Sequence, residues 1–123
     1  MRILLIIVLI ANALFEGLVG LLLIIAPESA ISDGSAAGIA FATNYGFAAL
    51  TVASVIAWCW KDKDNLRTMG VVLGLLSTFH SALTVATAIN MSTTGEPIPT
   101  IVHGIMALLC WFLFFNRSKW CSS

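Results

Sequence analysis

The chain has 123 residues, of which 59% are hydrophobic and 10% are charged, and its mean hydropathy is +1.00. Such a chain has too little polar surface to cover a soluble globule of this size, which predicts an integral membrane protein. Six basic and six acidic residues give a formal net charge of zero. Apart from the ends of the apolar runs, the sequence has no stripe of basic residues interleaved with aromatic ones. This argues against a nucleic-acid-binding protein.

Four apolar runs occupy nearly the whole chain. A helix rises about 1.5 Å per residue, so about 20 residues cross the hydrocarbon core of a bilayer. The predicted spans cover residues 3–26, 36–60, 66–90 and 98–115. Because the connections are short, consecutive helices are expected to be antiparallel neighbours. The predicted fold is an all-α, up-down-up-down four-helix bundle, with residues 1–123 forming a single transmembrane domain.

The segments between the spans carry residues that end or begin helices. They are a predicted loop over residues 27–34, the charged run 61–64 and a predicted turn over residues 92–96. The first of these begins with Pro27 and bears Asp33. Pro97 and Pro99 suit the first turn of the last helix, where a missing N–H costs little.

The basic residues predict the orientation in the membrane, because basic residues in short loops favour the cytoplasmic side. All six fall at the N-terminus, between the second and third spans or in the C-terminal tail: Arg2, Lys61, Lys63, Arg67, Arg117 and Lys119. Both termini are therefore predicted to be cytoplasmic. Trp58, Trp60 and Trp120 fall on the same predicted side, as an interfacial belt would.

Each predicted span carries a polar residue near one depth. Counting about 1.5 Å per residue from each midpoint places Glu16 and His80 about 3 Å to the outer side, and Asn44 and His103 about 6 Å. Asn12 lies one turn from Glu16 on the same helix face. A polar pocket in the bundle interior is therefore expected near the outer face.

These residues do not all deserve the same interpretation. Intramembrane amides and hydroxyls often only join helices, which is the preferred interpretation for Asn12, Asn44 and the threonines near His80. Charged or titratable groups in a membrane more often mark function, since an acidic or basic side chain at the centre of a helix costs roughly 2.5–3.5 kcal/mol on insertion. Glu16, His80 and His103 are therefore predicted to form a functional site.

Two stripes of small residues predict close helix packing. Gly70 and Gly74 lie one turn apart on the third span, and Ala49, Ala53 and Ala57 follow the same spacing on the second. Small residues let helix backbones approach closely in membranes. Internal packing of the bundle is the preferred interpretation, and a homo-oligomer interface is the alternative.

A metal or haem site is a less favoured prediction. Glu16, His80 and His103 offer the ligand types of a two-histidine, one-carboxylate centre, and two histidines on facing helices suit a haem. No HxxxH or ExxH spacing accompanies them. No metal ligand is therefore assigned, and a proton-coupled transporter built around Glu16 is a further alternative.

The chain also resembles the DoxX-like four-helix membrane proteins over its whole length. The resemblance lies in Asn12-x-x-x-Glu16-Gly17 with Pro27, in the run Phe41-Ala42-Thr43-Asn44-Tyr45-Gly46, and in Phe79-His80. Many such proteins carry an arginine near the position that Asn44 occupies here. The resemblance implies the four-helix fold, and it spans quinone-linked oxidoreductase subunits, receptor-assembly chaperones and sterol-enzyme scaffolds.

Two functions are predicted from these observations. In the first, an intramembrane polar site binds a small, largely apolar molecule or handles a proton. Glu16 is then the acid/base or anchoring group, His80 and His103 are its partners, and Asn44 orients it. In the second, the protein is an accessory or assembly subunit whose outer faces bind another membrane protein. Neither the catalytic residues nor a cofactor can be assigned from the sequence.

Overall fold

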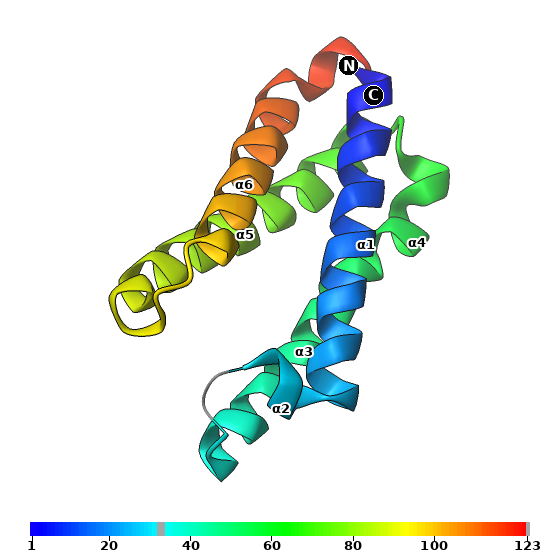
Figure 1. Ribbon diagram of the computed structural model, residues 1–123. Helices are drawn as coiled ribbons and strands as arrows, with labels where there is room; N and C mark the ends of the chain where they lie inside the picture. The colour runs from blue at the N-terminus through cyan, green and yellow to red at the C-terminus, as the bar shows by residue number, and fades with distance from the viewer. Residues whose placement is uncertain (32–33, 123) are drawn as a thin grey trace. The chain divides into compact units, whose positions relative to one another are not determined.

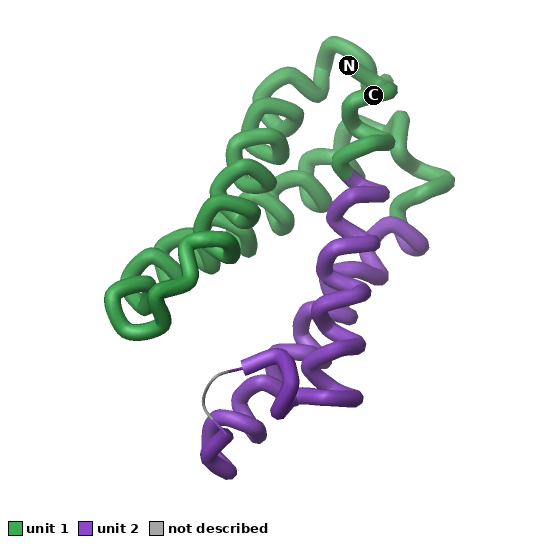
Figure 2. Tube along the Cα trace, in the orientation of Figure 1, with its two compact units in different colours: residues 1–8, 59–123 green, residues 9–58 purple. Residues whose placement is uncertain are grey.

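The computed structural model describes residues 1–31 and 34–122 and divides into two compact units (Figure 2). Unit 1 contains residues 1–8 and 59–123, and unit 2 contains residues 9–58. Each unit is described by itself below. Asp33, placed by the sequence in the loop after the first span, lies outside the described residues.

The described part of the chain is helical, and its only β-type pairing is an isolated bridge between Asn65 and Ser122. Within it, four helical stretches are long and apolar enough to cross a membrane. They are Arg2–Ile25, Ala36–Asp62, Leu66–Thr94 and Ile98–Lys119. The predicted helical class and the four apolar helices are therefore confirmed.

Unit 2 is a helical hairpin, and its elements are α1 (Arg2–Ile25, from Leu9 onward), α2 (Pro27–Ala30), α3 (Ala36–Ala53) and most of α4 (Val55–Cys59) (Figure 1). Residues that come later in α1 contact residues that come earlier in α3. Asn12 near the start of the α1 segment reaches the carbonyl of Val52, whereas Gly20 lies against Gly46. The two helices are therefore antiparallel.

The closest approach in unit 2 is between the backbones of Gly20 and Gly46. A Cβ built on either glycine would lie 2.8 Å from the carbonyl oxygen of the other. No real Cβ tolerates that distance, so only glycine permits this crossing. Neighbouring small residues widen the contact surface, since Gly17 faces Ala53 and Ala49 is fully buried. Ala49 and Ala53 of the predicted alanine stripe do pack inside the protein, whereas Ala57 is exposed, and glycines on both helices make the tightest contact.

The second apolar stretch is interrupted at Ser54, where the sequence predicts a continuous helix over residues 36–60. The Ser54 hydroxyl donates to the carbonyl of Thr51, and the Ala57 N–H bonds to the Ser54 carbonyl. Such side-chain bonds to the preceding turn compete with the regular helical pattern and bend helices. α3 therefore ends at Ala53, and α4 begins at Val55.

The predicted loop after Pro27 contains one helical turn. Pro27 stands in the first turn of α2, where its fixed φ suits the helix and no N–H is missed. The Ser29 N–H and hydroxyl both donate to the carbonyl of Ala26. The loop prediction was wrong for Pro27–Ala30 because proline at this position begins a helix as readily as it ends one.

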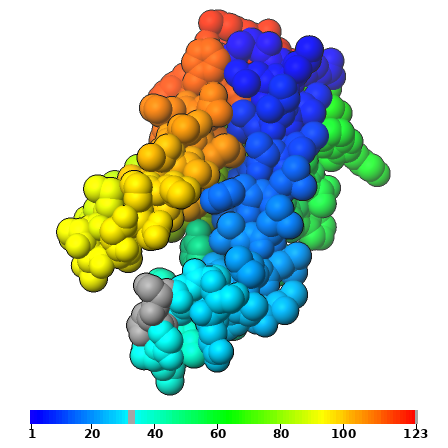
Figure 3. Space-filling view, viewed as in Figure 1, coloured from blue at the N-terminus to red at the C-terminus, as the bar shows by residue number. Residues whose placement is uncertain are grey.

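Unit 1 is built on a second hairpin, formed by α5 (Leu66–Thr94) and α6 (Ile98–Asn116) and flanked by the short 3-10 helices η1 (Trp60–Asp62) and η2 (Arg117–Lys119). Its two helices are antiparallel, because residues early in α5 contact residues late in the α6 segment and the reverse holds at the other end. Gly70 lies near Arg117, Ser81 bonds to Trp111, and Thr87 bonds to Thr100. The space-filling view shows side chains of α5 and α6 in contact around the connecting turn (Figure 3).

The glycines of α5 make room for large side chains at the end of α6 and in η2. A Cβ at Gly70 would lie 3.2 Å from Nε of Arg117, and one at Gly74 would lie 3.5 Å from the ring of Phe114. The preferred interpretation, internal packing, agrees with these contacts, but side chains and not backbone meet the two glycines. Glycine serves here because a guanidinium and an aromatic ring occupy the space that a side chain would fill.

Helix α5 runs past the predicted end of its span. Its first turn is capped by Asn65, whose side-chain oxygen accepts from the N–H groups of Arg67 and Thr68. At the other end, Thr94 bonds back to the carbonyl of Asn90, and Gly95 adopts the left-handed conformation with φ 70°. The predicted turn over residues 92–96 therefore begins only at Gly95, where glycine makes a left-handed cap inexpensive.

Three segments of unit 1 meet at one end of the hairpin (Figure 1). Arg2 forms an ion pair with Asp64. The N–H of Ser122 donates to the carbonyl of Asp64, and the N–H of Leu66 donates to that of Ser122. The N-terminus, the segment before α5 and the C-terminal tail therefore lie together, and these segments carry the basic residues of the chain.

Large apolar side chains remain exposed along the helices. Examples at more than half exposure are Ile3, Leu18, Phe41, Leu108 and Phe115. A water-soluble domain rarely exposes a continuous apolar surface of this extent. The packing therefore leaves apolar faces of the kind that a lipid bilayer would cover.

Candidate functional site

The polar residues inside unit 1 are centred on two histidines from different helices. His80 of α5 and His103 of α6 are both buried, and their Nδ1 atoms lie 3.0 Å apart. The ring planes are tilted by 32°. This distance fits a direct nitrogen to nitrogen hydrogen bond between the two helices. The structure therefore brings together two of the three titratable residues that the sequence singles out.

The contact dictates how protons are distributed between the rings. A hydrogen bond between two Nδ1 atoms needs a proton on one and a lone pair on the other. When both rings are neutral, the donor ring has a bare Nε2, whereas the acceptor ring carries its proton on Nε2. The pair is therefore directional, offering one acceptor and one donor at its outer nitrogens.

Neighbouring groups hold the rings in place. Phe79 packs edge-on against His80, with ring centroids 5.2 Å apart, and against His103 at 6.5 Å. One turn later, the hydroxyl of Thr84 donates to the carbonyl of His80 at 2.7 Å. The Ser77 hydroxyl likewise donates to its own helix, at Leu73. These hydroxyls bond to backbone, in agreement with the structural role that the sequence favours for the threonines.

Two further hydrogen bonds join the helices on either side of the histidines. Thr100 Oγ1 donates to Thr87 Oγ1 at 2.9 Å, and Trp111 Nε1 donates to Ser81 Oγ at 3.1 Å. Bonds of this kind in membranes contribute about 0.6 kcal/mol each on average. These two hydrogen bonds fix the register of α5 against α6. The register in turn places the two histidine rings opposite each other. The hydrogen bond of Trp111 was not predicted from the sequence.

A groove runs along the α5–α6 hairpin beside the histidines. It has a volume of about 340 Å³ and is lined by Ser81, Thr84, Gly104, Ala107, Leu108 and Trp111. Gly104 follows His103 in the chain, and Thr84 lies one turn after His80. Small-molecule sites typically have volumes of about 300–1,000 Å³ and mostly apolar walls with a few polar groups. The volume of the groove falls within this range, and its lining is mostly apolar with Ser81 and Thr84 as polar groups.

Glu16 and Asn12 belong to unit 2. Both side chains are buried on α1, and Nδ2 of Asn12 lies 3.4 Å from the carbonyl oxygen of Val52 on α3. Glu16 also interacts electrostatically with Tyr45 of α3. The burial agrees with the expectation that Glu16 avoids lipid. Tyr45 was named only within the run 41–46 and not as a site residue, although it stands next to Gly46, where the two helices approach most closely.

Asn44 lies elsewhere than expected. It is exposed on α3, whereas the neighbouring residues Ala42, Gly46 and Ala49 are buried. Successive residues turn by about 100° around a helix, so Asn44 points away from the face that packs on α1. The predicted role of Asn44 in orienting Glu16 from the interior does not agree with this position. Depth along a helix, on which the prediction was based, does not determine the direction of a side chain around the helix.

The histidine distance also bears on metal and haem binding. Metal to imidazole bonds of about 2.0–2.1 Å place two nitrogens about 3.3 Å apart on a tetrahedral ion and about 4 Å apart across a haem iron. The observed Nδ1 separation of 3.0 Å is shorter than both. In this conformation the two Nδ1 atoms are within hydrogen-bond distance of each other, so a metal held through both Nδ1 atoms would require the rings to separate.

Comparison with protein-family models, with curated proteins and with solved structures found no match for this chain. The resemblance to DoxX-like proteins therefore stays a prediction from the sequence.

Proposed function

We propose that the protein is a multi-pass membrane protein that handles protons at an intramembrane histidine pair. Four helices long and apolar enough to cross a bilayer support the membrane assignment. In the proposed topology the helices alternate in direction, and both termini and the segment before α5 are cytoplasmic. The concentration of basic residues in those segments supports this orientation.

The observation that carries the functional proposal is the 3.0 Å contact between the Nδ1 atoms of His80 and His103. Histidine is the side chain whose ordinary pKa lies closest to physiological pH, and histidine chains serve as proton relays in membranes. Helix joining alone would be achieved by amides or hydroxyls, which this hairpin already has at Thr87 and Ser81. A titratable pair at this position therefore favours proton handling.

The proposed transfer has three proton movements and leaves the charge and the number of protons of the pair unchanged. A proton arrives at the bare Nε2 of the donor ring. The proton between the two Nδ1 atoms moves to the acceptor ring, whose own Nε2 proton then leaves. One proton has entered and one has left, but the two tautomers are exchanged. A second transfer in the same direction requires the rings to reset, and this step would limit the rate.

Glu16 is proposed as the acid/base group that exchanges protons with this pair. Its predicted depth in the membrane equals that of His80, and its carboxyl group is buried. A small, largely apolar molecule in the groove beside Thr84 and Gly104 is the proposed proton donor or acceptor. The volume and lining of that groove support such an occupant.

The test is proton uptake by the purified protein in liposomes containing a pH-sensitive dye, measured from about pH 5 to pH 8, the range in which histidine ordinarily titrates. The His103→Asn variant keeps a hydrogen-bonding atom near the Nδ1 position but cannot titrate. Glu16→Gln likewise keeps shape and loses ionisation. We expect both variants to melt like the wild type and to lose pH-dependent uptake.

Thr78→Val is the matched control, because Thr78 is an exposed polar residue on α5 that bonds only to its own helix at Gly74. Uptake in this variant should equal that of the wild type. Wild-type uptake in both His103→Asn and Glu16→Gln would refute the proposal and leave the histidines a structural role.

An accessory or assembly subunit is the alternative proposal. Its support is the exposed apolar surface, including Phe41 and Trp58, which a second membrane protein would cover as well as lipid would. Mass spectrometry after gentle detergent extraction separates the two proposals. A bound small molecule supports the site, whereas a stoichiometric protein partner supports the accessory role.

A further inference from the structure

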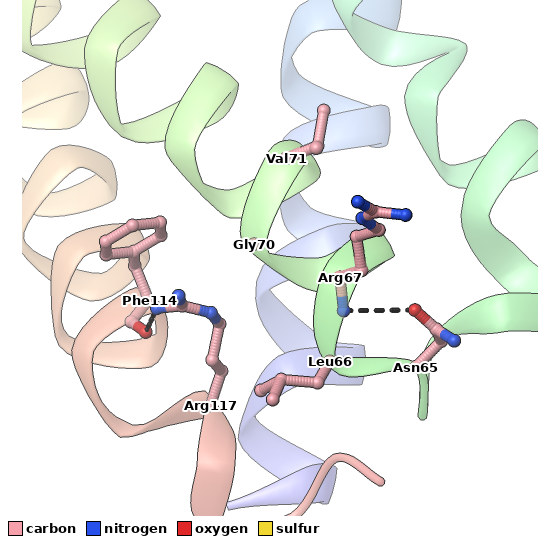
Figure 4. A pocket seen from close by; sticks show the side chains of 7 residues that line it. All are labelled: Asn65, Leu66, Arg67, Gly70, Val71, Phe114 and Arg117. Atoms are coloured by element: carbon pink, nitrogen blue, oxygen red, sulfur yellow. Dashed lines mark hydrogen bonds between the residues drawn. The ribbon is translucent and has the colours of Figure 1, made fainter. Parts of the chain in front are cut away.

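A second cavity lies at the opposite end of the α5–α6 hairpin from the connecting turn. It has a volume of about 610 Å³ and lies wholly within unit 1, between the first turns of α5 and the end of α6 (Figure 4). Its lining comprises Asn65, Leu66, Arg67, Gly70, Val71, Phe114 and Arg117. Two of the six basic residues of the chain therefore line one cavity.

Arg117 is held with its guanidinium facing this cavity. Its Nη1 donates to the carbonyl of Phe114 at 2.6 Å, and the guanidinium carbon lies 4.2 Å from the centre of the Phe114 ring. Nε of Arg117 is buried and has no hydrogen-bond acceptor among the described residues. Nε is shielded against Gly70, so the donor that a ligand oxygen could reach is the Nη2 group, which makes no hydrogen bond within the described residues.

The cavity lacks an acidic partner for its positive charge. Among the described residues the only ion pair joins Arg2 to Asp64, so neither Arg67 nor Arg117 has a carboxylate within ion-pair distance. The first N–H groups of α5 are already used, because the Asn65 side chain accepts from those of Arg67 and Thr68. The guanidinium groups, and not the helix end, are therefore the available anion-binding groups.

Gly70 keeps the cavity open. A Cβ at this position would lie 3.2 Å from Nε of Arg117 and would press against the guanidinium. Leu66, Val71 and Phe114 supply an apolar wall next to the two arginines. A charged site beside an apolar wall suits a ligand with an anionic head and a hydrocarbon tail.

We propose that this cavity binds a phosphate group, with Arg67 and Arg117 supplying positive charge from different sides of it and an anionic phospholipid as the favoured source. Guanidinium groups match phosphate oxygens in charge and geometry and bind them by paired hydrogen bonds. Basic pockets between membrane helices on the cytoplasmic side are typical headgroup sites. The cavity lies at the end of unit 1 for which the basic residues predict the cytoplasmic face.

The test uses native mass spectrometry of the full-length protein in detergent, titrated with phosphatidic acid or with phosphatidylcholine of the same acyl chains. We expect phosphatidic acid to bind about tenfold more tightly, a difference that corresponds to about one charge-assisted hydrogen bond. Arg67→Gln should abolish this preference. Arg67 is exposed and its side chain makes no hydrogen bond within the described residues, so the variant should fold normally.

Two further variants complete the test. Gly70→Ala should narrow the cavity and weaken phosphatidic acid binding without changing charge. Lys61→Gln removes one positive charge from an exposed residue outside the cavity and should keep the preference. Binding that excess inorganic phosphate cannot displace supports a lipid source, and displacement supports a soluble phosphate compound. Equal binding of both lipids, or the same loss in Lys61→Gln as in Arg67→Gln, would overturn the proposal.

Discussion

The Gly20–Gly46 contact allows a sharp test of the packing in unit 2. In Gly46→Ala, the new methyl group would lie 2.8 Å from the Gly20 carbonyl oxygen and 2.8 Å from Cγ1 of Ile24. Backbone cannot move aside as the end of a side chain can, so α1 and α3 must separate. The substitution should therefore destabilise the hairpin.

The size of the effect follows from two opposing terms. Alanine in place of glycine in a helix contributes about 0.5–1 kcal/mol of stability, because glycine loses more backbone freedom on folding. Overpacking of a tight contact costs about 1–3 kcal/mol. The net loss expected for Gly46→Ala is therefore about 1–2 kcal/mol, or roughly a tenfold shift toward the unfolded state.

Gly17→Ala is the matched control on the same interface. Its new methyl group would meet only Cβ of Ala53, at 3.8 Å, which is an ordinary contact. This variant should be as stable as the wild type or up to about 1 kcal/mol more stable. Reversible unfolding in mixed micelles, followed by circular dichroism, measures both. Equal stability of the two variants would refute the proposed helix crossing.

Three further predictions concern topology, thiol chemistry and the second hairpin. A cysteine at Thr93 should react with an impermeant maleimide in intact cells while Cys121 is protected, and the reverse pattern would invert the proposed orientation. Burial and the nearby Asp64 carboxylate raise the pKa of the Cys121 thiol, outweighing the opposite effect of Arg2 and Arg117. Because the thiolate reacts, alkylation of Cys121 in detergent should reach half its maximal rate at a higher pH than a free thiol does, and a midpoint at or below the free thiol's would contradict this. Gly74→Leu should lower the melting temperature, because the leucine side chain must displace Phe114. An unchanged melting temperature would mean that Gly74 does not face α6.

The apolar helices were predictable because length and hydropathy are properties of whole segments. The interruption at Ser54 was not, since serine and threonine occur in many unbroken membrane helices and only the hydroxyl bond to Thr51 shows the local bend. The end of α5 at Gly95 had a visible signal, because glycine favours the left-handed cap. The turn was nevertheless predicted from residue 92, because the polar residues 92–94 before this glycine are also common in turns.

The site was predictable in its residue types but not in its contacts. Depth counting correctly placed His80 and His103 at nearby levels, and the structure joins them through their Nδ1 atoms. Which nitrogens meet depends on side-chain rotamers and on the rotation of each helix, and neither follows from spacing. The same missing rotation explains the exposed position of Asn44. The approach of Glu16 to the histidines stays a prediction.

The histidine pair can be tested by nitrogen NMR of the protein labelled with ¹⁵N-histidine. The sequence contains two histidines, so every labelled ring signal comes from this pair. At about pH 8, where an ordinary histidine is neutral, the account predicts one ring protonated at Nδ1 and the other at Nε2, with coupling between the two Nδ1 nuclei. Two rings both protonated only at Nε2 would leave two lone pairs facing each other and would contradict the hydrogen bond on which the proposed proton transfer depends.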